Sequence, residues 1–161
     1  MLNTCILVAD RARARLFELA PPPENRASDP ARLLEREALV DPEGEVPVNQ
    51  LFSDPHRGTN HARSGASYEY DEHREQHRQE VARRFAKRIA VAAADFARSR
   101  GTARMILAAE PHMLGLLRDN VPRLLPKEVA LVELARDLSW HSPEHIRDVL
   151  LQHGLLAAPA A

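Results

Sequence analysis

The sequence predicts one α/β domain built on a mixed five-stranded sheet. Two short apolar runs, Thr4 to Ala9 and Arg104 to Ala109, are typical of strands that are covered on both faces. Between them, residues 71–100 contain neither Gly nor Pro and repeat apolar side chains every three or four positions, which predicts one long helix. A chain of 161 residues is long enough to bury a core of its own.

The N-terminal part predicts a meander of three strands. Asp10 and the residue after it interrupt the first apolar run, and residues 12–19 then alternate in the manner of a hairpin partner. Prolines 21–23 begin a connector, because proline cannot donate to a sheet ladder. Residues 32–40 are the third strand candidate; a helix competes with it, since Glu and Arg interrupt the apolar positions.

Beyond the long helix, the chain predicts two strand-plus-helix units. Pro111 occupies the first position of a helix, where its missing N–H does no harm, and Gly115 is expected to let that helix approach the sheet closely. Residues 129–135 are the fifth strand candidate. Ser142 is the predicted N-cap of a last helix, which Gly154 ends.

The order is therefore β-β-β-α-β-α-β-α. Right-handed crossovers make the two later strands parallel to the first, which predicts the sheet order 3-2-1-4-5 of the ribonuclease H-like layout. We expect a single domain at 1–154, with a long loop at 41–70, and a flexible tail at 155–161. The side chains expected to pack together in its core are Cys5, Leu7, Ile106 and Leu107 from the strands and Val81, Phe85, Ile89 and Phe96 from the long helix.

The composition says more about the cellular location of the protein than about its binding partner. The 22 basic and 23 acidic residues nearly cancel, so net charge favours no class of ligand. The single cysteine excludes a disulfide framework and suits a reducing compartment. The N-terminal apolar core is short and lacks basic residues, which argues against a signal peptide, and no apolar run approaches the roughly 20 residues of a membrane span. These features predict a cytoplasmic protein with no membrane partner.

The long loop at 41–70 is the most conspicuous candidate site. Loops of that length in a compact domain are usually functional or disordered. It carries His56, Arg57, His61 and Arg63 among glycines, and such side chains can meet phosphate oxygens and stack on unpaired bases. The alternative is a solvated loop that happens to be basic.

Arg13 and Arg15 share one face of the second strand. They could extend a basic, nucleic-acid-binding surface, or protect a solvated strand edge against pairing, and the pattern favours the second role. His73 and His77 stand four residues apart on the long helix, a spacing that can hold a metal. Their motif is not HExxH and no compact third ligand accompanies them, so we predict no tightly bound metal.

The sequence does not predict a nuclease or another enzyme. A two-metal nuclease on this fold needs a carboxylate within the first strand, whereas Asp10, Glu110 and Asp137 stand at a turn or at strand ends. A nucleophile elbow, a Gly-rich phosphate loop and a CxxC pair are all absent from the sequence. We therefore expect no catalytic residues and no cofactor.

Short motifs spread along the chain resemble a known family. They are Ala9-Asp10, Ala12 to Glu18, Phe85-Ala86, Ile106 to Ala109, Pro111, Leu114 to Arg118 and Asp137-Leu138. In order and spacing they are similar to the host-attachment protein family, whose bacterial members are described as required for attachment to host cells. That family in turn resembles the middle domain of archaeo-eukaryotic release factors and of Pelota.

The resemblance implies a binding role. In release factors, a Gly-Gly-Gln loop ahead of the long helix enters the ribosome; residues 53–65 here contain no Gly-Gly-Gln, so termination activity is not implied. The resemblance implies a non-catalytic module that binds the ribosome or structured RNA. The alternative is a protein-protein adaptor that affects attachment indirectly, and a loop-based hydrolase or nuclease is a distant third. The sequence does not indicate whether the protein is a monomer or an oligomer.

Overall fold

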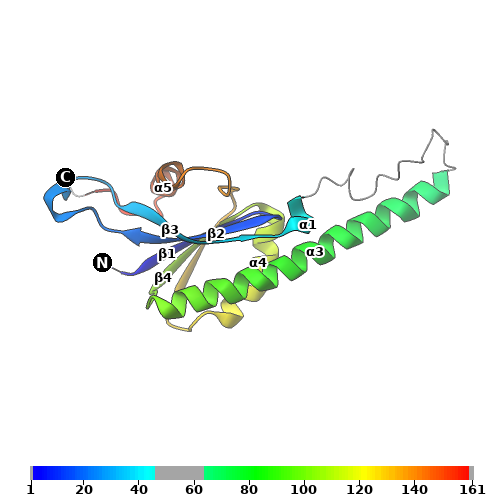
Figure 1. Ribbon diagram of the computed structural model, residues 1–161, viewed down its shortest axis with the longest axis horizontal. Coiled ribbons are helices and arrows are strands. Elements are labelled where there is room, and N and C mark those ends of the chain that lie inside the picture. The colour runs from blue at the N-terminus through cyan, green and yellow to red at the C-terminus, as the bar shows by residue number, and fades with distance from the viewer. Residues whose placement is uncertain (1, 46–63, 160–161) are drawn as a thin grey trace.

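The computed structural model describes residues 2–45 and 64–159. His56, Arg57, His61 and Arg63 lie outside these residues. The elements follow in the order β1 (Thr4–Ala9), β2 (Arg13–Ala20), the 3-10 turn η1 (Glu24–Arg26), β3 (Arg32–Val40), α1 (Pro42–Glu45), α3 (Ser64–Ser99), β4 (Arg104–Ala109), α4 (Pro111–Leu124), β5 (Ala130–Leu134) and α5 (Pro143–Gln152) (Figure 1).

The five strands form one mixed sheet in the order β3-β2-β1-β4-β5. The pairs β1–β2 and β2–β3 are antiparallel, and the pairs β1–β4 and β4–β5 are parallel. This arrangement confirms the predicted 3-2-1-4-5 order and the ribonuclease H-like layout. Residues 32–40 form a strand, so the helical alternative for that segment is wrong.

Helices cover both faces of the sheet, α3 and α4 on one face and α5 on the other (Figure 1). Every residue of β1 is buried. Successive side chains of a strand point to opposite faces, so Leu7 packs toward α3 and α4, while Ile6 packs toward α5. This double burial explains why the run from Thr4 to Ala9 contains no interior charge.

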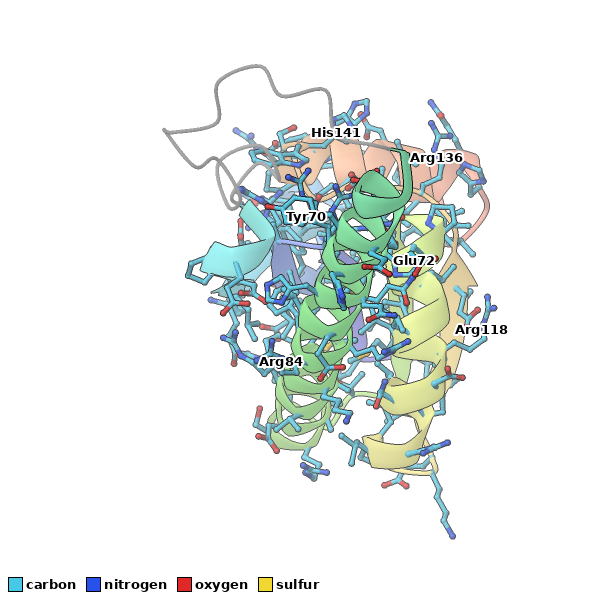
Figure 2. All side chains as sticks on the ribbon, turned by 90° about the vertical axis from the view of Figure 1, so that its right-hand side faces the viewer. Tyr70, Glu72, Arg84, Arg118, Arg136 and His141 are labelled. Carbon is cyan, nitrogen blue, oxygen red and sulfur yellow. The ribbon has the colours of Figure 1, made fainter. Side chains whose placement is uncertain are left out.

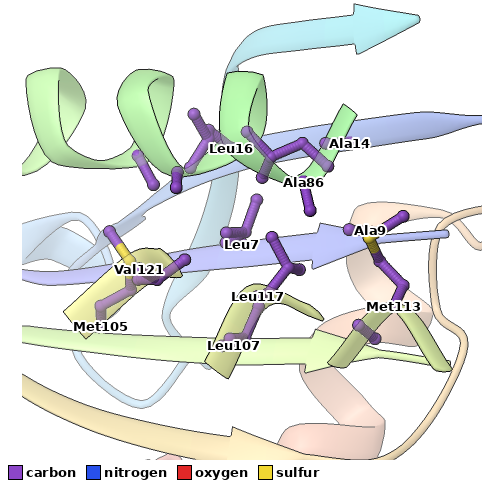
Figure 3. Packing of buried hydrophobic residues seen from close by; sticks show 14 of the residues in the cluster. Leu7, Ala9, Ala14, Leu16, Ala86, Met105, Leu107, Met113, Leu117 and Val121 are labelled. Carbon is purple, nitrogen blue, oxygen red and sulfur yellow. The ribbon is translucent and has the colours of Figure 1, made fainter. Parts of the chain in front are cut away.

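The larger core lies under α3 and α4. Figure 3 shows Leu117 of α4 over Leu7 of β1 and Leu107 of β4. Most of the predicted core residues meet here, namely Cys5, Leu7, Leu107, Phe85, Ile89 and Phe96. Ile106 was placed wrongly: it is fully buried, but it packs on the opposite face with Ile146. Neighbours in one strand cannot share a face, which is the reason for the correction.

Two boundaries differ from the predicted ones. The long helix begins at Ser64 instead of Asp71, and α1 forms before it, so both ends of the predicted loop at 41–70 are helical. At the C-terminus, the carbonyl of Leu155 accepts a hydrogen bond from Arg104 at 2.7 Å, and Leu156 is buried against the α5 side of the sheet. The chain therefore remains packed beyond the start of the predicted tail.

Gly44, and not Gly115, allows a close approach. A Cβ added at Gly115 would meet nothing within 4 Å, so the predicted tight packing at that position is wrong. A Cβ at Gly44 would lie 2.5 Å from the carbonyl oxygen of Arg11. The missing side chain lets α1 lie against the β1–β2 turn, where the amide of Asp41 donates to the carbonyl of Ala12 at 2.7 Å.

Within the described stretches, no helix combines the length and the apolar character needed to cross a membrane. The predicted cytoplasmic location stays a prediction.

Candidate functional site

The β1–β2 turn is tied to the segment that connects β5 to α5, residues 135–142. One carboxylate oxygen of Asp10 accepts hydrogen bonds from the amides of Ala12 (2.7 Å) and Arg13 (2.8 Å). The other accepts from the hydroxyl of Ser139 at 2.7 Å. Asp10 is 9% exposed and Ser139 is 2% exposed, so this bond is shielded from water. It fixes the two segments to each other.

Ser139 has a second carboxylate neighbour. An oxygen of Asp137 lies 2.5 Å from the Ser139 hydroxyl and 3.1 Å from the Ser139 amide. A hydroxyl has only one hydrogen, so Ser139 donates to one of the two carboxylates at a time, while its amide keeps Asp137 in place. The connecting segment is thus anchored through its backbone and through its side chain.

Arg15 anchors the same segment from β2. Its Nε and Nη2 donate to the two carboxylate oxygens of Glu35 on β3, at 2.9 and 2.8 Å. Its Nη1 donates to the carbonyls of Ser139 (3.1 Å) and His141 (2.6 Å). The side chain is only 15% exposed, and β2 is an inner strand, so Arg15 does not protect a sheet edge. These contacts make it a positioning residue, and its nucleic-acid role stays a prediction.

Glu35→Gln should weaken the fold in a pH-dependent way. The hydrogen bonds from Arg15 lower the pKa of Glu35 more than its partial burial raises it. A carboxylate with a lowered pKa adds stability above its unfolded pKa of about 4.3, and that stability is lost as the pH falls through the folded value. Because Glu35 is partly exposed, we expect the variant to lose less than about 1 kcal/mol at pH 7.

Urea unfolding at a series of pH values checks this prediction. The difference between wild type and Glu35→Gln should shrink as the pH falls from the unfolded pKa of about 4.3 through the lower folded pKa, because protonation of the wild-type carboxylate then removes its ion pair. A difference that stays constant over the whole series would show that the ion pair is not its source.

Trp140 is presented to solvent by this anchored segment. Its side chain is 68% exposed, the guanidinium carbon of Arg13 lies 3.4 Å from its ring centroid, and the residue lies between the anchored Ser139 and His141. The next residue along, His141, has its ring centroid 4.3 Å from that of His145 on α5. Figure 2 shows His141 beside α5, at the top of the view. We call Arg13, Trp140, His141 and His145 the Trp140 patch.

The sequence reasoning missed Trp140, His141 and His145. A signal was available, since Trp140 is the sole tryptophan and stands in a polar connecting segment, next to a histidine and just before a helix N-cap. Of the two predicted site residues that the structure describes, Arg13 lies in the patch and Arg15 does not.

The carboxylates at the strand ends also converge, but they stabilise local structure. Asp10, Glu110 and Asp137 line one shallow pocket at the ends of β1, β4 and β5. Glu110 caps α4 by accepting from the amides of His112 (3.1 Å) and Met113 (2.8 Å), and it pairs with Arg11 at 3.6 Å. Asp10 and Asp137 hold the turn and the segment described above. At least one oxygen of each carboxylate is therefore engaged within the protein.

His73 and His77 lie exposed on the first part of α3. The described residues contain no group of three His, Cys, Asp or Glu side chains arranged to hold a metal ion. The absence of a tightly bound metal or cofactor remains a prediction.

The first part of α3 extends beyond the sheet (Figure 1). None of the side chains at 69–80 is buried, and Val81 is the first buried one described along the helix. This stretch carries five acidic residues and two arginines. Tyr70 stacks on Arg74, with 4.3 Å between the guanidinium carbon and the ring centroid. The first part of the helix thus reaches away from the core.

A family comparison identifies the chain. The family described as "Protein required for attachment to host cells" matches residues 5–150. The chain belongs to this family. Among solved structures, it is similar to RuvC from Thermus thermophilus, with 11% sequence identity, a TM-score of 0.36 and coverage of 98% of this chain and 83% of that one. The comparison with curated proteins gave no match.

Proposed function

We propose that this host-attachment family member is a non-catalytic, cytoplasmic binding protein that associates with RNA or with the ribosome. The observation that carries the proposal is the shape of α3. It spans 36 residues, about 54 Å at 1.5 Å per residue, and its first part buries none of the side chains at 69–80. The first part of this helix is stabilised little by packing on the core, which suits a role in contacting a partner.

The segment that directly precedes α3 supplies the chemistry. His56, Arg57, His61 and Arg63 bring hydrogen-bond donors for phosphate oxygens, and Arg63 directly precedes Ser64 in the chain. The resemblance to release factors also supports an RNA contact at the N-terminal end of α3, because the loop of those proteins that enters the ribosome comes before their long helix.

A protein-protein adaptor is the second candidate, and the charge of α3 favours it. The stretch 69–80 has three more acidic than basic side chains, counting five carboxylates against two arginines. Such a surface repels phosphates and attracts a basic protein. The loop-based hydrolase or nuclease draws no support from the described residues.

The test of the proposal is sedimentation with ribosomes over a salt series. Wild-type protein should co-sediment at low salt and dissociate as salt rises, because each phosphate contact releases about one counterion. Replacing both Arg57 and Arg63 with Ala should make the slope of log affinity against log salt shallower. The change should be that expected for the loss of about two phosphate contacts. The melting temperature should stay almost unchanged, since the described core is built without either arginine.

A matched control removes two positive charges elsewhere. Arg123 and Lys127 are exposed near the C-terminal end of α4, and Arg123→Ala/Lys127→Ala should sediment like the wild type. If the wild type never co-sediments, or if both double mutants behave alike, the segment before α3 is not the RNA contact and the adaptor moves ahead.

A further inference from the structure

We propose that the pocket between α5 and the β2–β3 connector, residues 21–31, binds a phosphorylated sugar, either free or as the ribose phosphate of a nucleotide. Three arginines in its wall are placed to hold the phosphate, and Asp29 is placed to accept from the sugar hydroxyls. Figure 1 shows the connector at the left end of the sheet, whereas α3 begins at the right. The inference is therefore independent of the proposed RNA association.

The pocket joins two parts of the chain that are distant in sequence. The connector and the first residue of β3 supply Arg26, Asp29 and Arg32, and α5 supplies Arg147. The volume is about 470 Å³, within the roughly 300–1,000 Å³ that is usual for small-molecule sites. A ligand larger than a simple inorganic anion therefore has room in it.

The backbone of the connector is held in place by its own turns. The amide of Arg26 donates to the carbonyl of Pro23 at 2.8 Å, and the amide of Asp29 donates to the carbonyl of Arg26 at 2.8 Å. Proline restricts φ at Pro23 and Pro30, which also line the pocket. Leu33, at the start of β3, is buried in the same cluster as the inner side chains of α5. The two walls are thus fixed relative to each other, which lowers the entropy lost on binding.

The arginines have donors left for a ligand. The guanidinium groups of Arg26 and Arg32 make no hydrogen bond or ion pair within residues 2–45 and 64–159. Arg147 is 17% exposed; its Nε and Nη2 donate to one oxygen of Asp148, at 3.0 and 2.8 Å, which leaves Nη1 for a ligand. A phosphate ester presents oxygens in three directions, so guanidinium groups on different sides of a pocket can each meet one. A carboxylate has only two oxygens in one plane, which a single arginine satisfies.

The carboxylate in the wall narrows the ligand further. Asp29 repels a ligand that is anionic throughout, such as a polyphosphate, but its oxygens can accept from hydroxyls, as acidic residues do with ribose in dinucleotide sites. Asn25 adds an amide that both donates and accepts. Two neighbouring carboxylates, Glu24 and Asp148, do not line the pocket, and Asp148 is bonded to Arg147. A ligand with one anionic end and several hydroxyls fits this wall, and a phosphorylated sugar has that chemistry.

Isothermal titration calorimetry of the full-length protein at low salt tests the pocket. Ribose 5-phosphate should show saturable binding, and ribose should show none, because it lacks the phosphate. Inorganic phosphate should bind roughly 10-fold more weakly than ribose 5-phosphate, because it has no sugar hydroxyls for Asp29. Adenosine monophosphate separates the two sources of the ligand. Tighter binding than that of ribose 5-phosphate indicates a nucleotide, and equal or weaker binding indicates a free sugar phosphate.

Variants assign the roles within the pocket. Arg26→Gln and Arg32→Gln should each weaken binding of ribose 5-phosphate roughly 10-fold, which corresponds to one lost charge-assisted hydrogen bond. Asp29→Ala should weaken binding of ribose 5-phosphate but not of inorganic phosphate, because it removes a hydroxyl acceptor and a negative charge together. Arg123→Gln, exposed near the end of α4, is the charge-matched control and should bind like the wild type. All four variants should melt close to the wild type, since these side chains are exposed.

The inference is overturned if neither ribose 5-phosphate nor adenosine monophosphate binds saturably at millimolar concentration. It is also overturned if Arg26→Gln/Arg32→Gln binds ribose 5-phosphate as well as the wild type does. Equal losses of both ligands in Asp29→Ala would overturn the assignment of a sugar. Sedimentation with ribosomes is measured separately, and Arg26→Gln/Arg32→Gln should co-sediment like the wild type. Failure of this inference therefore leaves the proposed function standing, and the reverse holds as well.

Discussion

Phe85→Ala should lower the free energy of unfolding by about 3–5 kcal/mol. Phe85 is fully buried on the face of α3 that packs against the sheet, in the same cluster as Leu7 and Leu107. The truncation removes a buried aromatic ring from the core. It leaves a cavity that the rigid strands of the facing sheet cannot fill. Urea unfolding followed by circular dichroism measures the loss.

Arg83→Ala is the control on the same helix. Arg83 is exposed and pairs with Glu80 at 3.7 Å, a surface contact worth at most a few tenths of a kcal/mol. A Phe85→Ala variant as stable as Arg83→Ala would mean that α3 does not pack on the sheet through this face.

Asp10→Ala should cost about 2–4 kcal/mol of stability, the second largest effect that we expect. The substitution leaves the partly buried amides of Ala12 and Arg13 without their acceptor, and a fully buried donor that loses its partner costs about 1–3 kcal/mol. The Ser139 hydroxyl suffers less, because it can turn fully to Asp137. The fluorescence of Trp140 should change as well, since the segment that carries it loses one anchor.

Asp10→Asn separates the role of the amides from that of the charge. Its side-chain carbonyl can still accept from both backbone amides, so we expect a smaller loss than in Asp10→Ala. Equal stability of wild type and Asp10→Ala in thermal and urea unfolding would contradict the role assigned to this carboxylate.

The sheet was predictable because its strands follow one-dimensional rules. The apolar runs that became β1 and β4 are buried on both faces, and the order of elements allowed few topologies. The prediction placed Ile106 on the wrong face of the sheet, although the alternation of side chains along a strand determines that face. The start of α3 was missed because the serines and Gly65 in its first turns are poor helix formers, a weak preference that the rest of the helix overrides.

The candidate site depends on contacts that no local pattern reveals. Asp10 and Ser139 are 129 residues apart in the sequence, and Arg15 joins three segments at once. The sequence showed Arg13 and Arg15 as a pair on one strand face. It could not show that Arg15 is committed to Glu35 and two carbonyls while Arg13 lies against an exposed tryptophan.

The most direct test of the central claim is a pull-down of the tagged full-length protein from the cells that produce it, at low salt. RNA in the eluate is quantified by absorbance and sequencing, and proteins are identified by mass spectrometry. We predict that ribosomal RNA co-purifies and is lost when the wash is raised to high salt. Recovery of one discrete protein partner with no RNA above that of a tag-only control would contradict the claim and establish the adaptor.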